Sequence, residues 1–189
     1  MHMLAKVKSY IEKQNLPLPP AKLIVGVSGG ADSVVLLHLL CRLGYQCVVA
    51  HCNFHLRGDE SLRDENFVEG LCKAEGVPFI KIDFDTEAYA TQHHLSIEMA
   101  ARELRYEWFE QVRLQQSAEA IAVGHHADDV AETFLMNITR GTGLKGLTGI
   151  KARNGYIIRP LLDCSREEIE SYAQTERIAF VHDSSNSEQ

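Results

Sequence analysis

Short apolar runs alternate with longer stretches of helical periodicity along the 189-residue chain. Each run is apolar or nearly so and lacks the strict alternation of a half-exposed strand. This pattern predicts strands that are buried on both faces of a sheet. The predicted strands are residues 23–27, 47–50, 79–82, 120–123 and 156–158.

Apolar residues spaced three or four apart predict helices around these runs. Gly44 and Gly76 end two of the helices, and Ser96 begins another. Ser165, with Glu168 three residues later, is a capping-box signature for the last one. The predicted helices cover about residues 4–11, 34–43, 60–75, 97–112 and 127–139, with the last beginning after residue 165.

Strands that alternate with helices predict an α/β fold, a Rossmann-like parallel sheet of about five strands with helices on both faces. Pro17, Pro19 and Pro20 must end the first helix, because proline lacks an amide N–H and clashes with the preceding turn. We therefore expect a lead-in helix and proline-rich linker at residues 1–20 and the main α/β domain at residues 21–189.

The composition, 45% apolar and 24% charged, is that of a globular protein with one core. No stretch approaches the roughly 18 apolar residues of a membrane span and no signal sequence is visible, so we expect a cytoplasmic protein without a membrane partner. Five cysteines without a C-x-x-C pair disfavour a disulfide framework or a metal cluster. The net charge of −7 disfavours coating of nucleic acid, although a local basic patch still allows an RNA substrate.

A glycine-rich segment links the first strand to the first buried helix. At the carboxyl end of a parallel strand, a helix N-terminus presents free N–H groups and a positive dipole to an anion. Glycines let the backbone approach phosphate oxygens, serines add hydrogen-bond donors, and an aspartate can hold magnesium. We expect a nucleotide phosphate to bind at Ser28, Gly29, Gly30, Ala31, Asp32 and Ser33.

Other interpretations of this segment are weaker. It lacks the G-x-x-x-x-G-K-[ST] pattern of a Walker loop. Residues 26–30 also fit the G-x-S-x-G elbow of serine hydrolases, but that fold needs several strands before the elbow. A plain glycine turn with a capping serine is the remaining alternative.

A histidine and acidic cluster follows the fourth predicted strand, from Gly124 to Thr133. The ends of parallel strands share one sheet edge, so we expect the cluster to face the glycine-rich segment. Asp129 and Glu132 are three residues apart on one helical face, and carboxylates beside polyphosphate suit magnesium ligands or a base for an amine. Compensation of the helix dipole, with capping by Asp128, would also explain acids here. His125 and His126 lack the i, i+4 spacing of zinc ligands, which favours hydrogen bonds to substrate or nucleotide.

A second glycine-rich segment begins after Arg140 and matches G-x-G-x-x-G at residues 141–146. It follows a predicted helix instead of a strand, so it is not a dinucleotide-binding fingerprint. Arg140 and Lys145 suit a loop that touches phosphates, and a plain surface loop is the alternative.

Residues 28–33 resemble the S-G-G-x-D-S signature of the N-type ATP pyrophosphatases, which cleave ATP to AMP and pyrophosphate. From about residue 22 onward the chain is similar to the N-terminal catalytic domain of the tRNA(Ile)-lysidine synthetase family, which has an adenine nucleotide alpha-hydrolase-like fold. Phe54-His55 stands where that family usually has His-Gly, which leaves the role of His55 open. Further matches are residues 51–57 with Ser61, Glu98 with residues 101–102 and 105–106, residues 124–129 with 132–133, residues 140–144 with 146–147, residues 159–162, and Asp183 with Asn186.

The resemblance implies a ligase that uses ATP and magnesium. It would adenylate the C2 oxygen of the wobble cytidine of tRNA(Ile) with a CAU anticodon, and L-lysine would then displace AMP through its ε-amine. We expect further C-terminal domains, and a homodimer is one option for the assembly. The expected catalytic residues are Asp32, Asp129, Glu132 and His125, with magnesium on Asp32 and Asp129.

Candidates for contact with substrate or RNA carry charge or follow the family pattern. Glu98, Arg102 and Arg105 form one polar stripe, for which a solvated row of ion pairs is the alternative. Arg57, Arg140 and His126 complete the set.

Two other functions stay open at this point. A tRNA sulfurtransferase of the same superfamily would generally need a cysteine pair, which the chain lacks. A regulatory module that binds ATP without chemistry would not require so many acids near phosphate.

Overall fold

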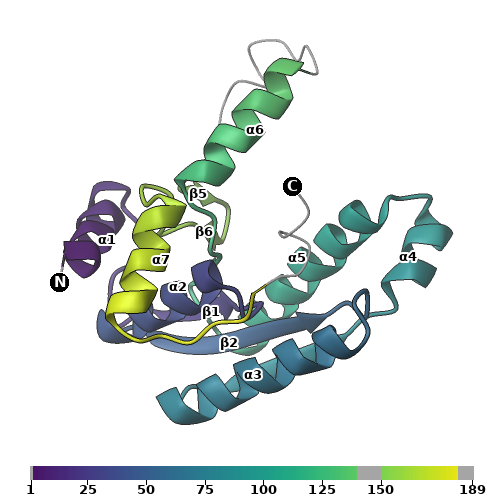
Figure 1. Ribbon diagram of the computed structural model, residues 1–189, viewed down its shortest axis with the longest axis horizontal. Coiled ribbons are helices and arrows are strands. Elements are labelled where there is room, and N and C mark those ends of the chain that lie inside the picture. The colour runs from purple at the N-terminus through teal and green to yellow at the C-terminus, as the bar shows by residue number, and fades with distance from the viewer. Residues whose placement is uncertain (1, 140–149, 183–189) are drawn as a thin grey trace.

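The computed structural model describes residues 2–139 and 150–182, and Figure 1 shows a central sheet with helices on both of its faces. Within these residues, six strands lie in the order β3-β2-β1-β4-β6-β5, and all neighbours are parallel except β5 and β6. The strands are β1 (Lys22–Gly26), β2 (Gln46–Asn53), β3 (Phe79–Asp83), β4 (Ala120–Ala122), β5 (Arg153–Asn154) and β6 (Ile157–Ile158). The helices are α1 (His2–Lys13), α2 (Ala31–Arg42), α3 (Asp59–Glu75), α4 (Thr86–His93), α5 (Ile97–Gln115), α6 (Ala127–Thr139) and α7 (Arg166–Thr175). The predicted α/β fold is confirmed.

Two elements differ from the sequence prediction. Helix α4 buries only Thr86 and Ala90, so its sequence carries no apolar stripe to reveal it. Strand β5 consists of two exposed residues that pair antiparallel with β6 at the edge of the sheet. Neither element has the hydrophobic pattern on which the prediction depended.

The core lies on both faces of β1. Leu23 and Val25 pack into a cluster with the buried faces of α1, α2 and α7. Ile24 points to the other face, where it packs with Trp108 and Val112 of α5. Because successive side chains of a strand point to opposite faces, one strand contributes to both halves of the core.

The first and last helices are joined to each other. Val7 and Ile11 of α1 are buried in the same cluster as Ile169 of α7. The Lys6 ammonium lies 2.8 Å from a carboxylate oxygen of Glu168. The lead-in helix therefore packs on the body of the domain.

Both predicted helix caps are present. The Ser96 hydroxyl accepts a hydrogen bond from the Met99 N–H at 3.2 Å. Ser165 and Glu168 form the complete capping box at the start of α7. These caps satisfy N–H groups that have no acceptor within their own helices.

The order of the strands places the functional edge of the sheet. The chain runs from β1 outward to β2 and β3, and then crosses to β4 on the other side of β1. Ligands of open α/β sheets bind in the crevice at such a reversal, outside the carboxyl ends of the strands. The two segments that leave β1 and β4 meet there. Helix α6 begins at this edge and projects from the body (Figure 1).

In the part of the chain that the structure describes, every helix is too short or too polar to cross a membrane.

Candidate functional site

The segment that follows β1 curls around the hydroxyl of Ser33. That oxygen lies 3.2 Å from the Ser28 N–H and 3.3 Å from the Gly29 N–H, and its own proton is donated to the Gly30 carbonyl at 3.0 Å. Ser33 is buried and holds the loop, whereas Ser28 is exposed. Gly29 has a φ of +106°, which favours glycine.

The N-terminus of α2 is open to a ligand. Its N-cap residue, Gly30, supplies no side-chain cap, so the first-turn N–H groups receive no acceptor from it. Gly30, Asp32 and Ser33 line a pocket of about 250 Å³ at the sheet edge. An uncapped helix start beside a pocket is the arrangement that binds phosphate.

Side chains from three strand ends and from α5 complete this pocket. It lies between the loop after β1, the ends of β2 and β4, and the helix α5. Its further lining residues are Gly26, Val27, Ser28, Ala50, Cys52, Phe54, Arg105, Tyr106, Phe109, Val123, Gly124 and His125. The structure thus brings the two predicted strand-end segments together.

His126 lies between the acids of the two segments. Its Nε2 atom is 3.4 Å from the Asp32 carboxylate and 3.6 Å from that of Asp129, and the imidazole is 1% exposed. The hydrogen bond with Asp32 raises the pKa of His126 above its usual range, against the opposite effect of burial. His126 therefore orients the two carboxylates and is not placed to reach a substrate itself.

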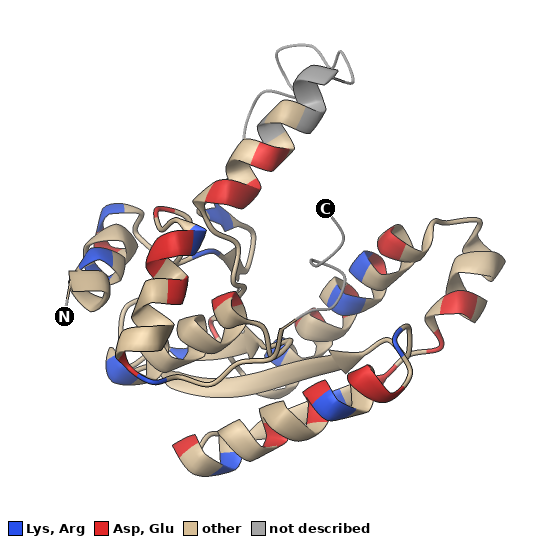
Figure 2. Ribbon diagram, viewed as in Figure 1, with Lys and Arg blue, Asp and Glu red and all other residues tan. Residues whose placement is uncertain are grey.

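The remaining acids of the cluster have other partners. The Asp129 carboxylate accepts the backbone N–H of His126 at 2.8 Å and so also caps α6. Asp128 accepts the N–H of Arg166 at 2.7 Å, which caps α7 instead of its own helix. Glu132 is exposed, 3.9 Å from the Arg166 guanidinium. Figure 2 shows acidic residues at the starts of both helices.

His125, unlike His126, has an arginine as its hydrogen-bond partner. Its Nδ1 atom accepts a hydrogen bond from the buried Arg159 side chain at 3.0 Å. Burial lowers the pKa of His125, and the Arg159 charge lowers it further. The imidazole is therefore neutral at pH 7, with its proton on Nε2, and the residue lines the pocket.

The polar stripe on α5 divides between pocket and solvent. Arg105 lines the pocket with its guanidinium 5.1 Å from the centre of the Phe54 ring. Arg102 lies 5.1 Å from the ring of Tyr106, and Arg102 and Glu98 are both exposed. Only Arg105 of the three contributes to the pocket wall.

The departure at Phe54-His55 now has a physical description. Phe54 lines the pocket, stacks on Phe84 at 5.6 Å and supports Arg105. His55 has a φ of +52° and is fixed by Asn53 and Asp83 at 3.0 and 2.8 Å. His55 shapes the turn outside this pocket.

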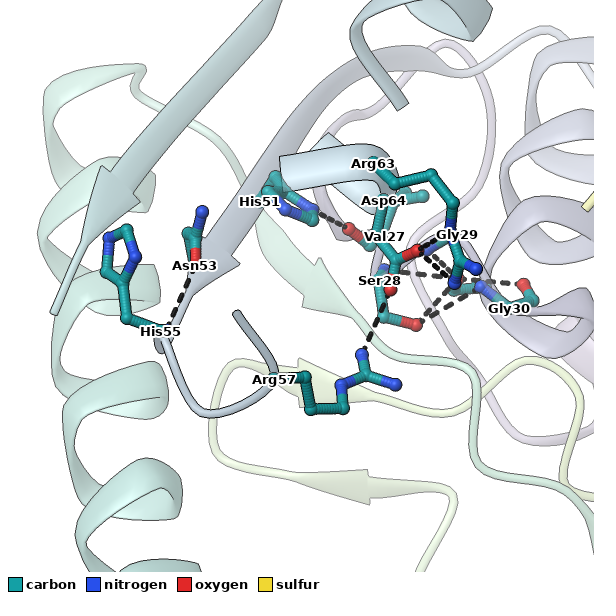
Figure 3. Close-up of polar contacts among 11 residues, drawn as sticks. Val27, Ser28, Gly29, Gly30, His51, Asn53, His55, Arg57, Arg63 and Asp64 are labelled. Atoms are coloured by element: carbon teal, nitrogen blue, oxygen red, sulfur yellow. Dashed lines mark hydrogen bonds and ion pairs between the residues drawn. The ribbon is translucent and has the colours of Figure 1, made fainter. Parts of the chain in front are cut away.

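Arg57 lies in the loop after β2, where Figure 3 shows its guanidinium directed at Asp64. The hydrogen bond from the Arg57 guanidinium to the Asp64 carboxylate measures 3.0 Å, and the same carboxylate also accepts a hydrogen bond from Arg63.

His51 connects β2 to the end of β1. Its Nδ1 atom lies 2.8 Å from the Val27 carbonyl oxygen, and burial lowers the pKa of its imidazole.

The acids at the pocket suit magnesium only in part. The residues that the structure describes contain no group of three or more histidine, cysteine, aspartate or glutamate side chains arranged around one point. Asp32 and Asp129 do converge on one imidazole nitrogen. Magnesium is usually bound by one or two carboxylates together with substrate phosphates and water. These two residues therefore fit an ion that arrives with a nucleotide.

Arg140 and the second glycine-rich segment, residues 141–146, lie outside the described residues, as do Asp183 and Asn186. The pocket also includes residues that the sequence prediction did not assign, above all Tyr106, Phe109 and Cys52, with Arg159 behind His125. Arg159 belongs to a matching family block, but its burial and its contact with His125 come only from the fold.

Comparison with known proteins agrees with this geometry. A family model described as a PP-loop domain matches residues 2–189. The tRNA(Ile)-lysidine synthases of Parabacteroides distasonis and Bacteroides thetaiotaomicron are 54% and 57% identical over 97% of the chain. The chain spans only 42% and 43% of their respective lengths.

Solved structures share the fold at low identity. The U34-tRNA thiolase of Methanococcus maripaludis gives a TM-score of 0.75 at 18% identity, with 94% of this chain and 65% of that one covered. The NMN synthetase of Francisella tularensis gives 0.62 at 16% identity, with 93% and 70% covered. The uncapped loop after β1, its position at the reversal of strand order and the match along almost the whole sequence lead to one conclusion: this chain belongs to the PP-loop domain family.

Proposed function

We propose that the chain is the ATP-using catalytic part of a tRNA(Ile)-lysidine synthase. The observation that carries this proposal is the 54–57% identity to proteins of that name over 97% of the chain. The pocket at the end of β1 supplies a compatible place for the nucleotide. A cytoplasmic location and tRNA(Ile) and L-lysine as substrates belong to the same proposal.

The proposed reaction has two steps. The C2 oxygen of the wobble cytidine attacks the α-phosphorus of ATP, and pyrophosphate leaves with the electrons of the broken P–O bond. The ε-amine of lysine then attacks C2, and AMP leaves with the former C2 oxygen while the nitrogen loses a proton. ATP is thereby consumed to make that oxygen a good leaving group.

The residues of the pocket can serve these steps through binding and orientation. The open start of α2 holds the phosphates by N–H groups and by the helix dipole. His125 offers its Nε2 proton to an oxygen of the nucleotide or of the base, and Arg105 adds a positive charge at the wall. Magnesium, when bound by Asp32 and Asp129, would neutralise phosphate charge.

The acids of α6 are the proposed partners of lysine. Asp129 and Glu132 lie three residues apart near the start of this helix. A carboxylate there can hold the ammonium group and accept a proton as the amine attacks. Glu132 is exposed and paired only weakly with Arg166, so it is free to turn toward a substrate.

A sulfurtransferase reaction is less compatible with the pocket. Cys52 is the cysteine that lines it, and burial raises the pKa of its thiol to about 12. Sulfur transfer depends on a thiolate, which this environment disfavours. All five cysteines lie among the described residues, and none of them forms a disulfide bond.

Pyrophosphate release tests the proposal. The intact protein should release pyrophosphate from ATP only when L-lysine and tRNA(Ile) with a CAU anticodon are both present. A tRNA with adenosine at the wobble position, which has no C2 oxygen, is the matched control. Equal release with the control tRNA would contradict the proposed acceptor.

A further inference from the structure

The chain after α7 returns to residues 28–33, called the phosphate-binding loop below because of their proposed role. We propose that Val181 is a positioning residue whose backbone N–H aims the Gly30 N–H at a nucleotide phosphate. This inference rests on the proposed use of ATP at this loop. It concerns residues 177–182, called the return segment below, which none of the site predictions included.

The end of α7 sets the direction of the return segment. Arg177 adopts a φ of +57°, and the Ile178 N–H donates to the Ala173 carbonyl at 2.8 Å. This six-to-one bond with a left-handed residue is the Schellman ending of a helix. The chain therefore leaves α7 in a fixed direction.

Apolar contacts then hold the return segment against the body. Ile178 and Phe180 pack on the main core cluster, whereas Ala179 between them is exposed. Side chains of α2 and α3 line one pocket with residues 176–179. The segment, drawn at the yellow end of the colour scale in Figure 1, thus lies against both helices before it reaches the loop.

The contact with the loop is made by Val181. Its N–H donates to the Gly29 carbonyl at 3.0 Å. Its Cγ2 atom would lie 2.8 Å from a Cβ atom placed on Gly29, and Val68 and Phe67 of α3 would lie at 3.5 and 3.6 Å. Gly29 is therefore enclosed between the return segment and α3.

The planarity of the peptide bond converts this contact into a positioning effect. In a trans peptide the carbonyl of Gly29 and the N–H of Gly30 point in opposite directions. Fixing the carbonyl toward Val181 therefore turns the Gly30 N–H to the other side. Gly30 lines the pocket, and its N–H has only a 3.5 Å contact with the Ser28 hydroxyl. The direction of the Gly30 N–H is therefore fixed while its own hydrogen bond is weak, which leaves it available to donate to a phosphate oxygen.

An amide-to-ester replacement at Val181 removes the N–H and keeps the side chain. In the intact protein we expect it to weaken ATP binding by at least about tenfold, since a misdirected donor loses a hydrogen bond to a charged oxygen. The same replacement at the exposed Ala179 is the matched control, with ATP affinity within about twofold of wild type.

Two readouts separate positioning from general stability. The amide signal of Gly30 should shift in the nitrogen–proton NMR spectrum of the Val181 ester and not in that of the Ala179 ester. In the wild-type protein, which needs no variant to fold, ATP should slow hydrogen exchange at the Val181 amide, because coupling between two sites is reciprocal. Unchanged exchange at Val181, or equal loss of affinity in the two esters, would overturn the inference.

The outcome is distinguishable from a failure of the proposed function. ATP binding is measured without lysine or tRNA. Normal ATP binding with no lysine transfer contradicts the lysidine assignment and leaves the role of Val181 intact. A Val181 ester that binds ATP with wild-type affinity and transfers lysine supports the lysidine assignment and contradicts the role of Val181.

Discussion

Gly124→Ala tests how closely the end of β4 approaches residues 28–33, the proposed phosphate-binding loop. A Cβ atom at this position would lie 3.1 Å from the Asp32 carbonyl carbon and 3.1 Å from the Ser33 nitrogen. Both neighbours are backbone atoms in the first turn of α2, which a side-chain rotation cannot relieve. The methyl group must therefore displace the helix start by a few tenths of an ångström.

The size of the effect follows from two opposing contributions. Overpacking of a tight site costs about 1–3 kcal/mol. Replacing glycine by alanine stabilises the folded state by about 0.4–1 kcal/mol, because alanine lowers the conformational entropy of the unfolded chain. We therefore predict that Gly124→Ala lowers the free energy of unfolding by about 1–2 kcal/mol and raises the KM for ATP, because the displaced atoms belong to the loop.

Gly70→Ala is the matched control. Gly70 lies within α3, and a Cβ atom there would meet nothing within 4 Å. This variant should be more stable than wild type by about 0.5–1 kcal/mol and bind ATP normally. Urea unfolding with linear extrapolation measures both changes. A Gly124→Ala protein as stable as Gly70→Ala, with an unchanged KM, would refute the close approach.

Three further predictions concern single side chains. Asp32→Ala should reduce ATP turnover at least about 100-fold without loss of folding, since its side chain is 38% exposed, as steady-state kinetics and circular dichroism can show. Arg105→Lys should raise KM about two- to fivefold in the same assay, because lysine cannot stack its charge flat on Phe54. Hydrogen bonds lower the pKa of Glu168, so its stabilisation is present above the usual glutamate pKa and is lost as pH falls through the lowered one. Glu168→Gln should therefore flatten the acid limb of a plot of unfolding free energy against pH, and an unchanged limb would contradict this.

The fold could be predicted from the sequence because a strand that is buried on both faces has a continuous run of apolar residues. Leu23, Ile24 and Val25 form such a run, and all three are buried between helices. Local signals such as Ser165 with Glu168 were also sufficient, since a capping box is made within four residues. Helix α4 and strand β5 were missed, because they bury too little to leave a pattern.

The sequence predicts which segments meet at the candidate site, but not how their side chains pair. Strand ends and glycines indicated where Asp32 and Asp129 would meet, and both do lie beside His126. Capping of its own helix is the alternative role that the sequence suggests for Asp128, but its carboxylate accepts the N–H of Arg166, 38 residues away. This contact and that of Val181 with Gly29 join segments that lie far apart in the sequence, so no local sequence pattern predicts them.

Transfer of labelled lysine tests the central claim most directly. Intact protein, ATP, radiolabelled L-lysine and tRNA(Ile) with a CAU anticodon should yield one labelled nucleoside at the wobble position, with AMP and pyrophosphate formed in equal amounts. The tRNA with adenosine at that position should stay unlabelled. Active protein that binds ATP yet leaves the cytidine-containing tRNA unlabelled would contradict the account.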